Sequence, residues 1–177
     1  NVAVGKNAAY SLTTGNRNTY VGDNAGYAHT TADYNVGVGY FALRSNTTGT
    51  RNIAIGSNAL DAADTESDNI AIGHDALGGA VAGGEKNLAI GNYTLDALTS
   101  GEKNIAIGHN SGTGLTTGSN NIAIGYAVLD AATTESHNIG IGYAALGGAI
   151  SGGGNNMAIG SYTLDGLTSG DNNLAVG

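Results

Sequence analysis

The chain has 177 residues and a formal net charge of −8, with glycine at 31 positions, charged residues at 11%, and neither cysteine, proline nor tryptophan. Its acidic balance and its six scattered lysines and arginines argue against electrostatic binding to nucleic acid or to anionic lipid. The lack of cysteine excludes disulfides, thiolate metal sites and redox chemistry at sulfur.

A five-residue motif, Asn-x-Ala-Ile/Val-Gly with some variation at its third position, returns eleven times along the chain. Its copies begin at residues 1, 18, 35, 52, 69, 87, 104, 121, 138, 156 and 173, so each step is 17 or 18 residues long. A fixed period of this size is typical of a solenoid, in which each repeat contacts only its neighbours. The sequence therefore predicts an all-β, repetitive parallel β-solenoid or β-roll of about ten coils over 1–177, with no second domain.

The first five positions of each coil predict a strand and a bend. Positions 2 to 4, as in Ile53-Ala54-Ile55, alternate large and small apolar residues, which is the period-two pattern of a short strand. Position 3 is Ala or Gly except at Tyr20, so the face it points to must accept small side chains, as it would if another backbone lay close. Position 5 is always glycine, which predicts a positive φ or a backbone approach with no room for a Cβ.

The asparagine at position 1 is equally constant. Asparagine tolerates the left-handed backbone conformation, and stacked copies can pass amide hydrogen bonds from coil to coil as a ladder. The structural repeat positions on which the prediction rests are Asn52, Gly56, Asn69, Gly73, Asn87, Gly91, Asn104, Gly108, Asn121, Gly125, Asn138 and Gly142.

The second part of each coil carries another apolar pair, a small residue at position 8 and usually leucine at position 9, and its conformation is either a short strand or a helical turn. Position 12 adds an apolar residue, for example Leu98, Ala80 or Ala149, before a polar Thr-Thr-Gly-like turn. The two 18-residue coils, 69–86 and 138–155, are glycine-rich before the next asparagine, so we expect their extra residue to bulge from that surface turn.

A longer period lies above the coil. The 69-residue block 52–120 is repeated from residue 121, with drift at polar positions. Duplication lengthens a rod, and it would be unusual for a unique active site. Because the chain begins at motif position 1 and ends at position 5, we expect it to be a fragment of a longer fibrous protein.

Such a thin coil is expected to need partners. About four inward apolar side chains per coil contribute roughly 6 to 12 kcal/mol, whereas ordering 17 residues costs on the order of 25 kcal/mol. Backbone hydrogen bonds supply part of the difference, and burial of one face against identical chains would supply more. The sequence therefore predicts a homotrimer, in which packing around a three-fold axis would also explain the small residues at positions 3 and 8.

The motif also carries a resemblance. Asn120 to Gly125, Asn-Asn-Ile-Ala-Ile-Gly, is similar to the head repeats of trimeric autotransporter adhesins, which form a left-handed parallel β-roll of three chains. The longer unit Thr47 to Leu60 resembles more closely the repeats of trimeric phage and viral tail fibres. The resemblance implies a structural shaft or stalk that holds a receptor-binding tip, located on a virion or otherwise outside the cell. The alternative is a bacterial surface adhesin or extracellular filament whose coils bind host matrix or glycans.

The histidines and the acidic residues are the candidates for metal chemistry. His74 and His109 share position 6 but lie two coils apart, too far for one zinc ion, and His29 and His137 are expected to be surface residues of turns. The acidic run of Asp61, Asp64, Glu66 and Asp68 could suggest calcium, but the duplicated block replaces two of the four, so a solvated acidic edge is favoured.

Tyrosines gather at positions 6 and 7. Exposed aromatic rows can bind glycans, so Tyr126 and Tyr143 are candidate contacts, although packing against a neighbouring chain is favoured. No catalytic, cofactor or metal residue is assigned, and no enzyme activity is expected. The expected partners are further copies of the chain and, through regions outside it, a cell-surface glycan or protein receptor, with neither nucleic-acid binding nor membrane insertion.

Overall fold

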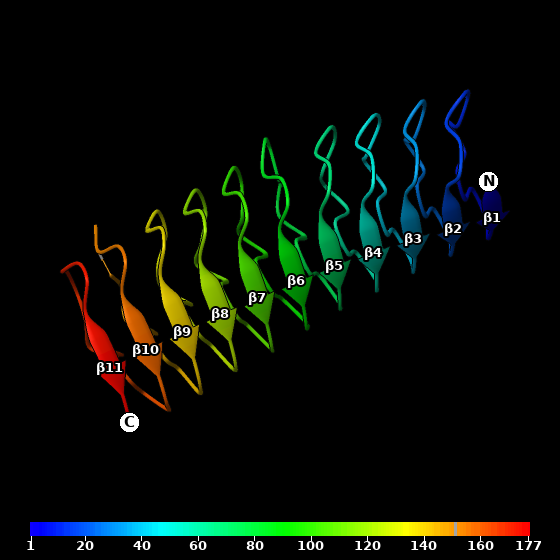
Figure 1. The fold of residues 1–177 in the computed structure, drawn as a ribbon. Helices are drawn as coiled ribbons and strands as arrows, with labels where there is room; N and C mark the ends of the chain where they lie inside the picture. Colours follow the sequence, from blue (N-terminus) through cyan, green and yellow to red (C-terminus); the bar gives the residue numbers. More distant parts are fainter. Residues whose placement is uncertain (151) are drawn as a thin grey trace.

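The structure, a computed structural model, describes residues 1–150 and 152–177 as a rod of stacked coils (Figure 1). Each coil contributes one three-residue strand to a single sheet of 11 parallel strands, ordered along the rod as in the sequence. The strands are β1 (Val2–Val4), β2 (Thr19–Val21), β3 (Val36–Val38), β4 (Ile53–Ile55), β5 (Ile70–Ile72), β6 (Leu88–Ile90), β7 (Ile105–Ile107), β8 (Ile122–Ile124), β9 (Ile139–Ile141), β10 (Met157–Ile159) and β11 (Leu174–Val176). The predicted all-β parallel solenoid is confirmed, and the described residues contain no helix.

The strands pair in strict register, so that equivalent repeat positions stack along the rod. Ile53 pairs with Ile70, and Ala54 pairs with Ala71. The 18-residue coil keeps this alignment, since Ile70 pairs with Leu88. The extra residue is therefore absorbed outside the sheet.

The glycine bend at position 5 has both of the predicted causes. Gly56 has a φ of 137°, in the region that side chains rarely adopt, and the other described copies with a following coil are similar. A Cβ on Gly56 would also collide with the carbonyl oxygen of Gly73 on the next coil. Any larger residue here would force neighbouring coils apart.

The predicted asparagine ladder is present along the whole rod. The Oδ1 atom of each position-1 asparagine accepts the backbone N–H of the next one, as from Asn121 to Asn104 at 2.9 Å. The Nδ2 atom donates across the same coil to the position-15 carbonyl, as from Asn104 to Gly118 at 2.8 Å. One buried side chain thus joins two walls of its own coil and also joins that coil to the next.

The left-handed residue next to the ladder is at position 17, and the suggestion that position 1 uses this conformation is wrong. Arg51, Lys103 and Asn120 have φ values of 59°, 58° and 59°, whereas no position-1 asparagine has a positive φ. Position 1 is free to begin the extended strand because the preceding residue makes the turn.

The second part of the coil is neither a strand nor a helical turn. Positions 7 and 9 are both left-handed, as at Asn58 (φ 56°) and Leu60 (φ 49°). The N–H of a position-9 residue donates to the position-8 carbonyl of the next coil, as from Leu43 to Ala59 at 3.1 Å. Alternating handedness lets this segment curve while it still hydrogen bonds along the rod axis.

The interior of each coil is narrow and contains the small residues. In the fourth coil the fully buried apolar side chains are Ala54, Ala59, Leu60 and Ala63. A Cβ on Gly37, at position 3, would lie 3.3 Å from the carbonyl oxygen of Ala42, at position 8 of the same coil. Positions 3 and 8 are therefore small because the two walls of one coil lie close together, and the explanation by a neighbouring chain is wrong.

In the 18-residue coils the inward apolar residue is one place later than predicted. Val81 and Ile150 are each 2% exposed, whereas Ala80 and Ala149 lie outside. The turn that follows is held by a buried glutamate of the preceding coil, because Glu66 Oε1 accepts the N–H of Gly83 at 2.8 Å and Glu135 Oε1 accepts that of Gly152 at 3.0 Å. The extra residue is thus accompanied by a second change in the preceding coil, where position 15 is glutamate instead of a small residue.

Candidate functional surface

The outward face of the strands is a continuous apolar surface, which we call the strand face. It consists of positions 2 and 4 of every coil, because position 3 points into the coil and its neighbours point away. Most of these side chains are half-buried by their neighbours along the rod, and Ile55 is still 39% exposed. At about 4.8 Å per coil the strand face runs for roughly 48 Å. Contiguous exposed apolar surfaces of this kind mark interaction sites.

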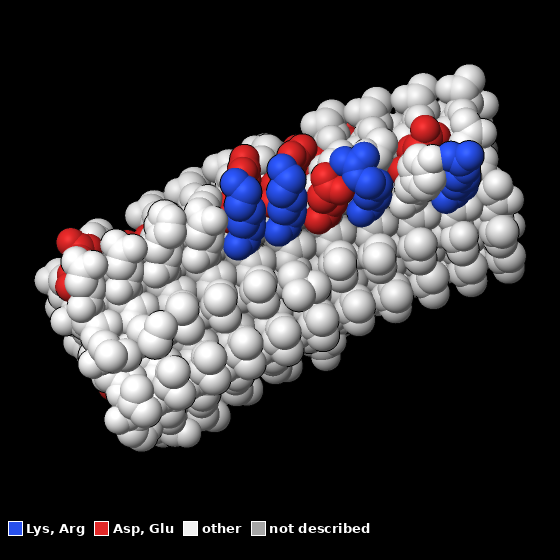
Figure 2. Space-filling view, in the orientation of Figure 1, with Lys and Arg blue, Asp and Glu red and all other residues white. Residues whose placement is uncertain are grey.

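The strand face carries no charge. None of the strand residues is Lys, Arg, Asp or Glu, and the region over the strands is white in Figure 2. The outward residues are Val2, Val4, Thr19, Val21, Val36, Val38, Ile53, Ile55, Ile70, Ile72, Leu88, Ile90, Ile105, Ile107, Ile122, Ile124, Ile139, Ile141, Met157, Ile159, Leu174 and Val176.

A row of aromatic rings lies at the bend that follows the strands, and we call it the aromatic row. It links His74, Tyr93, His109, Tyr126, Tyr143 and Tyr162, with 5.1 to 5.8 Å between successive ring centroids. Tyr126 and Tyr143 are each 46% exposed, and their planes differ by 5°. The two candidate glycan contacts are therefore brought together on the surface.

The stacking limits what the aromatic row can bind. Sugar rings pack against the face of an aromatic ring, and both faces of Tyr126 are occupied by His109 and Tyr143. The hydroxyl of Tyr162 raises the pKa of Tyr143. The row thus presents ring edges and hydroxyls, and its clearest contribution is to stabilise the stack of coils within one chain.

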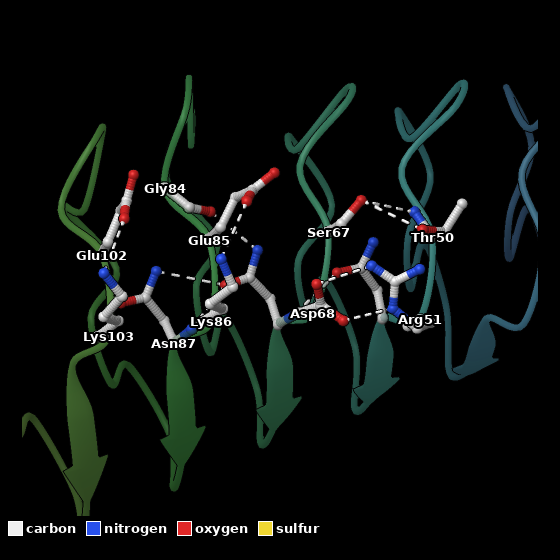
Figure 3. A network of polar contacts seen from close by, with 12 residues as sticks. Thr50, Arg51, Ser67, Asp68, Gly84, Glu85, Lys86, Asn87, Glu102 and Lys103 are labelled. Carbon is white, nitrogen blue, oxygen red and sulfur yellow. Dashed lines mark hydrogen bonds and ion pairs between the residues drawn. The ribbon is translucent and has the colours of Figure 1, made fainter.

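Charged side chains gather in a second row on the turn before the strands (Figure 2). Arg51 forms a two-pronged ion pair with Asp68 on the next coil, with Nε–Oδ1 at 2.5 Å and Nη2–Oδ2 at 2.8 Å. This pairing lowers the pKa of Asp68. Lys86 pairs with Glu85 at 3.7 Å and Lys103 with Glu102 at 3.6 Å (Figure 3). Because both signs alternate, this row offers no single-sign surface for a polyanion.

The acidic run is not a uniformly solvated edge. Asp61 pairs with Arg44 at 3.4 Å and Asp68 with Arg51, while Glu66 is only 5% exposed. Glu66 Oε2 accepts the backbone N–H groups of Asp64 and Thr65. The prediction of a solvated edge is therefore wrong for Glu66 and for its duplicate, Glu135.

The histidines divide into two kinds. His74, His109 and His137 are exposed, but His29 is fully buried, so its assignment as a surface residue is wrong. No group of three or more His, Cys, Asp or Glu in residues 1–150 and 152–177 is arranged to hold a metal ion. A depression of about 240 Å³ lies beside the aromatic row, lined by Asp75, Gly78, Gly79, Tyr93 and Asp96. Burial, together with the nearby Asp75 charge, raises the pKa of Asp96.

The fold and surfaces define a class, a parallel β-solenoid rod with one apolar face. Comparison with known proteins adds no family to this class, since no family model, curated protein or solved structure matches the chain. A search of the described residues for a helix long and apolar enough to cross a membrane found none. Sequence reasoning missed the charged row and the buried glutamates, because the residues at these turn positions differ from coil to coil and the Arg51–Asp68 and Glu66–Gly83 contacts span successive coils.

Proposed function

We propose that this chain is the shaft of a homotrimeric fibre of the phage or viral tail-fibre type, which holds a receptor-binding tip away from the particle. The observation that supports this most directly is the strand face, an uncharged aliphatic surface that runs along all 11 strands. In a monomer this apolar surface would be exposed to water along its whole length, whereas association would bury it.

Three chains suit the shape of the strand face better than two. The face is only one three-residue strand wide, and the chain bends away from it at the glycine of position 5. A narrow strip on a convex rod can meet two equivalent strips at a three-fold axis, so that each chain buries its strand face against both partners. The trimer thereby supplies the apolar burial that one thin coil lacks.

The shaft function follows from the same geometry. Every coil is joined to the next by sheet hydrogen bonds, by the asparagine ladder and by the glycine contacts, so the rod resists bending along its length. Repetition sets its length, and no catalytic group is needed. The location that we propose is a virion or the outside of a cell.

The test is the mass of the 177-residue protein by sedimentation equilibrium, with three chains of 17.4 kDa expected per particle. Ile107→Lys places a charge in the middle of the strand face and should yield monomers or loss of the rod. Thr117→Lys, on an exposed turn, is the matched control and should remain trimeric. A stable, folded monomer of the unaltered chain would refute the trimer.

The alternative function is a bacterial surface adhesin whose coils bind glycans, and the exposed hydroxyl edge of the aromatic row is the observation that favours it. A glycan array would detect such binding directly. Binding that is abolished by Tyr126→Ala with Tyr143→Ala, in a protein that stays trimeric and equally stable, would support the adhesin over the shaft.

A further inference from the structure

The second coil, 18–34, has an interior unlike that of any other described coil. Position 3 is Tyr20 where the others have alanine or glycine, and position 12 is His29. Both side chains are 0% exposed, and their rings lie 4.9 Å apart at 48°. This coil therefore holds a buried aromatic and titratable pair in an interior that elsewhere is aliphatic.

The ring of Tyr20 fits because two neighbouring positions are glycine. A Cβ on Gly26, where most coils carry leucine, would lie 2.6 Å from the Tyr20 ring, and a Cβ on Gly37 would lie 3.0 Å from it. The Tyr20 ring is thus tightly packed against the backbones of its own coil and the next.

The partner of His29 fixes its protonation state. His29 Nε2 lies 3.0 Å from Nδ2 of Asn35, the ladder residue of the third coil. Asn35 Oδ1 accepts the N–H of Asn52 at 2.8 Å, and Asn35 Nδ2 donates to the Gly49 carbonyl at 2.9 Å. The ladder therefore determines which way the amide points, and the amide presents a donor to the imidazole. Nε2 must be the lone-pair nitrogen of a neutral ring.

Protonation of His29 would place two donors against each other. A flip of the Asn35 amide would not relieve this, because Nδ2 would then face the N–H of Asn52 and the ladder would break. The proton of the neutral ring is on Nδ1, which has no hydrogen-bond partner. Neither ring nitrogen has an acceptor that would stabilise an imidazolium.

No charge near His29 offsets this cost. The same position on the adjoining coils holds Leu12 and the buried Asn46, neither of them charged, and the Asn46 amide is used on the backbone of Gly49. Tyr20 and Asn35 contact the ring and are also neutral. The carboxylate of Asp33, on the same coil, points outward and accepts the N–H of Asn16 at 2.6 Å. Burial accordingly lowers the pKa of His29 from 6.5 to about 4.

We propose that the second coil is an acid-opened segment of the rod, in which protonation of His29 breaks the asparagine ladder at Asn35 and releases the first three coils. In a solenoid each coil is supported only by its neighbours, so opening at one end need not spread to the other. The coils from β4 onward have no buried histidine among their described residues and stay closed.

The test is hydrogen exchange measured by mass spectrometry between pH 7.5 and pH 5, corrected for intrinsic exchange rates. With a pKa of 6.5 in the open coil and about 4 in the closed one, the opening equilibrium of segment 1–51 should rise about 30-fold at pH 5. Segment 104–150 should change far less. Equal acceleration of both segments, or none in 1–51, would overturn the proposal.

Two variants identify the responsible group. His29→Leu, which restores the leucine found at Leu98 and Leu115, should abolish the acid-dependent opening of 1–51. His137→Leu, at an exposed histidine, should leave it intact, and retention of the acid response in His29→Leu would refute the role of His29. The imidazole of the unaltered chain gives a check that needs no variant: by NMR His29 should titrate near pH 4, and titration near 6.5 would contradict the mechanism.

Discussion

The asparagine ladder makes a quantitative prediction for Asn104→Ala. The Asn104 side chain accepts the N–H of Asn121 at 2.9 Å and donates to the carbonyl of Gly118 at 2.8 Å, both inside the rod. Alanine would leave one buried donor and one buried acceptor without partners. At about 1–3 kcal/mol for each such group, the free energy of unfolding should fall by roughly 2–6 kcal/mol.

Asn173 provides the matched control, because its side chain makes one ladder bond, to Asn156 Oδ1 at 2.9 Å, and is partly exposed in the last coil. Asn173→Ala should cost less than about 1 kcal/mol. Both values come from urea unfolding followed by circular dichroism at one fixed protein concentration, since association shifts apparent stability. If the two variants differ by less than about 0.5 kcal/mol, the ladder does not contribute as argued here.

Three further predictions concern packing, backbone strain and pH. Gly140→Ala places a Cβ 2.5 Å from Val128 Cγ1 and should lower the free energy of unfolding by about 1–3 kcal/mol. Adding Val128→Ala should recover this stability, and a double variant as unstable as Gly140→Ala would argue against the contact. Lys103→Gly removes a side chain from a left-handed residue with φ 58° and a surface ion pair of little value, so it should stabilise by about 1 kcal/mol, and an unchanged Tm would contradict this. Burial alone would raise the pKa of Glu135, but the N–H groups of Gly152, Thr134 and Thr133 lower it below the ordinary 4.5. Its carboxylate therefore adds stability that is present above pH 4.5 and lost as the pH falls through the folded-state value; the advantage over Glu135→Gln should shrink in acid, and a constant difference would refute the reasoning.

The period and the constant positions of the repeat were predictable, because their physical causes act identically in every coil. A residue that must have a positive φ and must also lack a Cβ can only be glycine, and Gly56 and its equivalents satisfy both conditions. An asparagine that hydrogen bonds to its own copy on the next coil must likewise recur without exception. Sequence reasoning therefore succeeds at the positions that hold the same residue in every coil.

The orientation of the strands could not be predicted in the same way. Alternation in Ile53-Ala54-Ile55 indicates that the two faces differ, but it does not indicate which one lies inside. The interior takes Ala54 because the opposite wall of the coil lies too close for a larger residue, and the isoleucines are left outside. This choice of inner face depends on the distance between the two walls of the coil, which cannot be read from the sequence of one repeat. Its consequence is the strand face, the feature on which the proposed trimer rests.

Departures from the repeat were the least predictable feature, and the structure explains them as pairs. Where one inward residue is larger than usual, an adjacent position is glycine: a Cβ on Gly140 would lie 2.5 Å from Cγ1 of Val128, at position 8 of the preceding coil. The second coil extends this rule to Tyr20. Against the consensus alone, Gly140 looks like neutral drift and His29 looks like a turn residue. Beside the neighbouring coil, Gly140 instead leaves room for Val128 and Gly37 leaves room for the Tyr20 ring, so an unusual residue in this rod is informative about its neighbour.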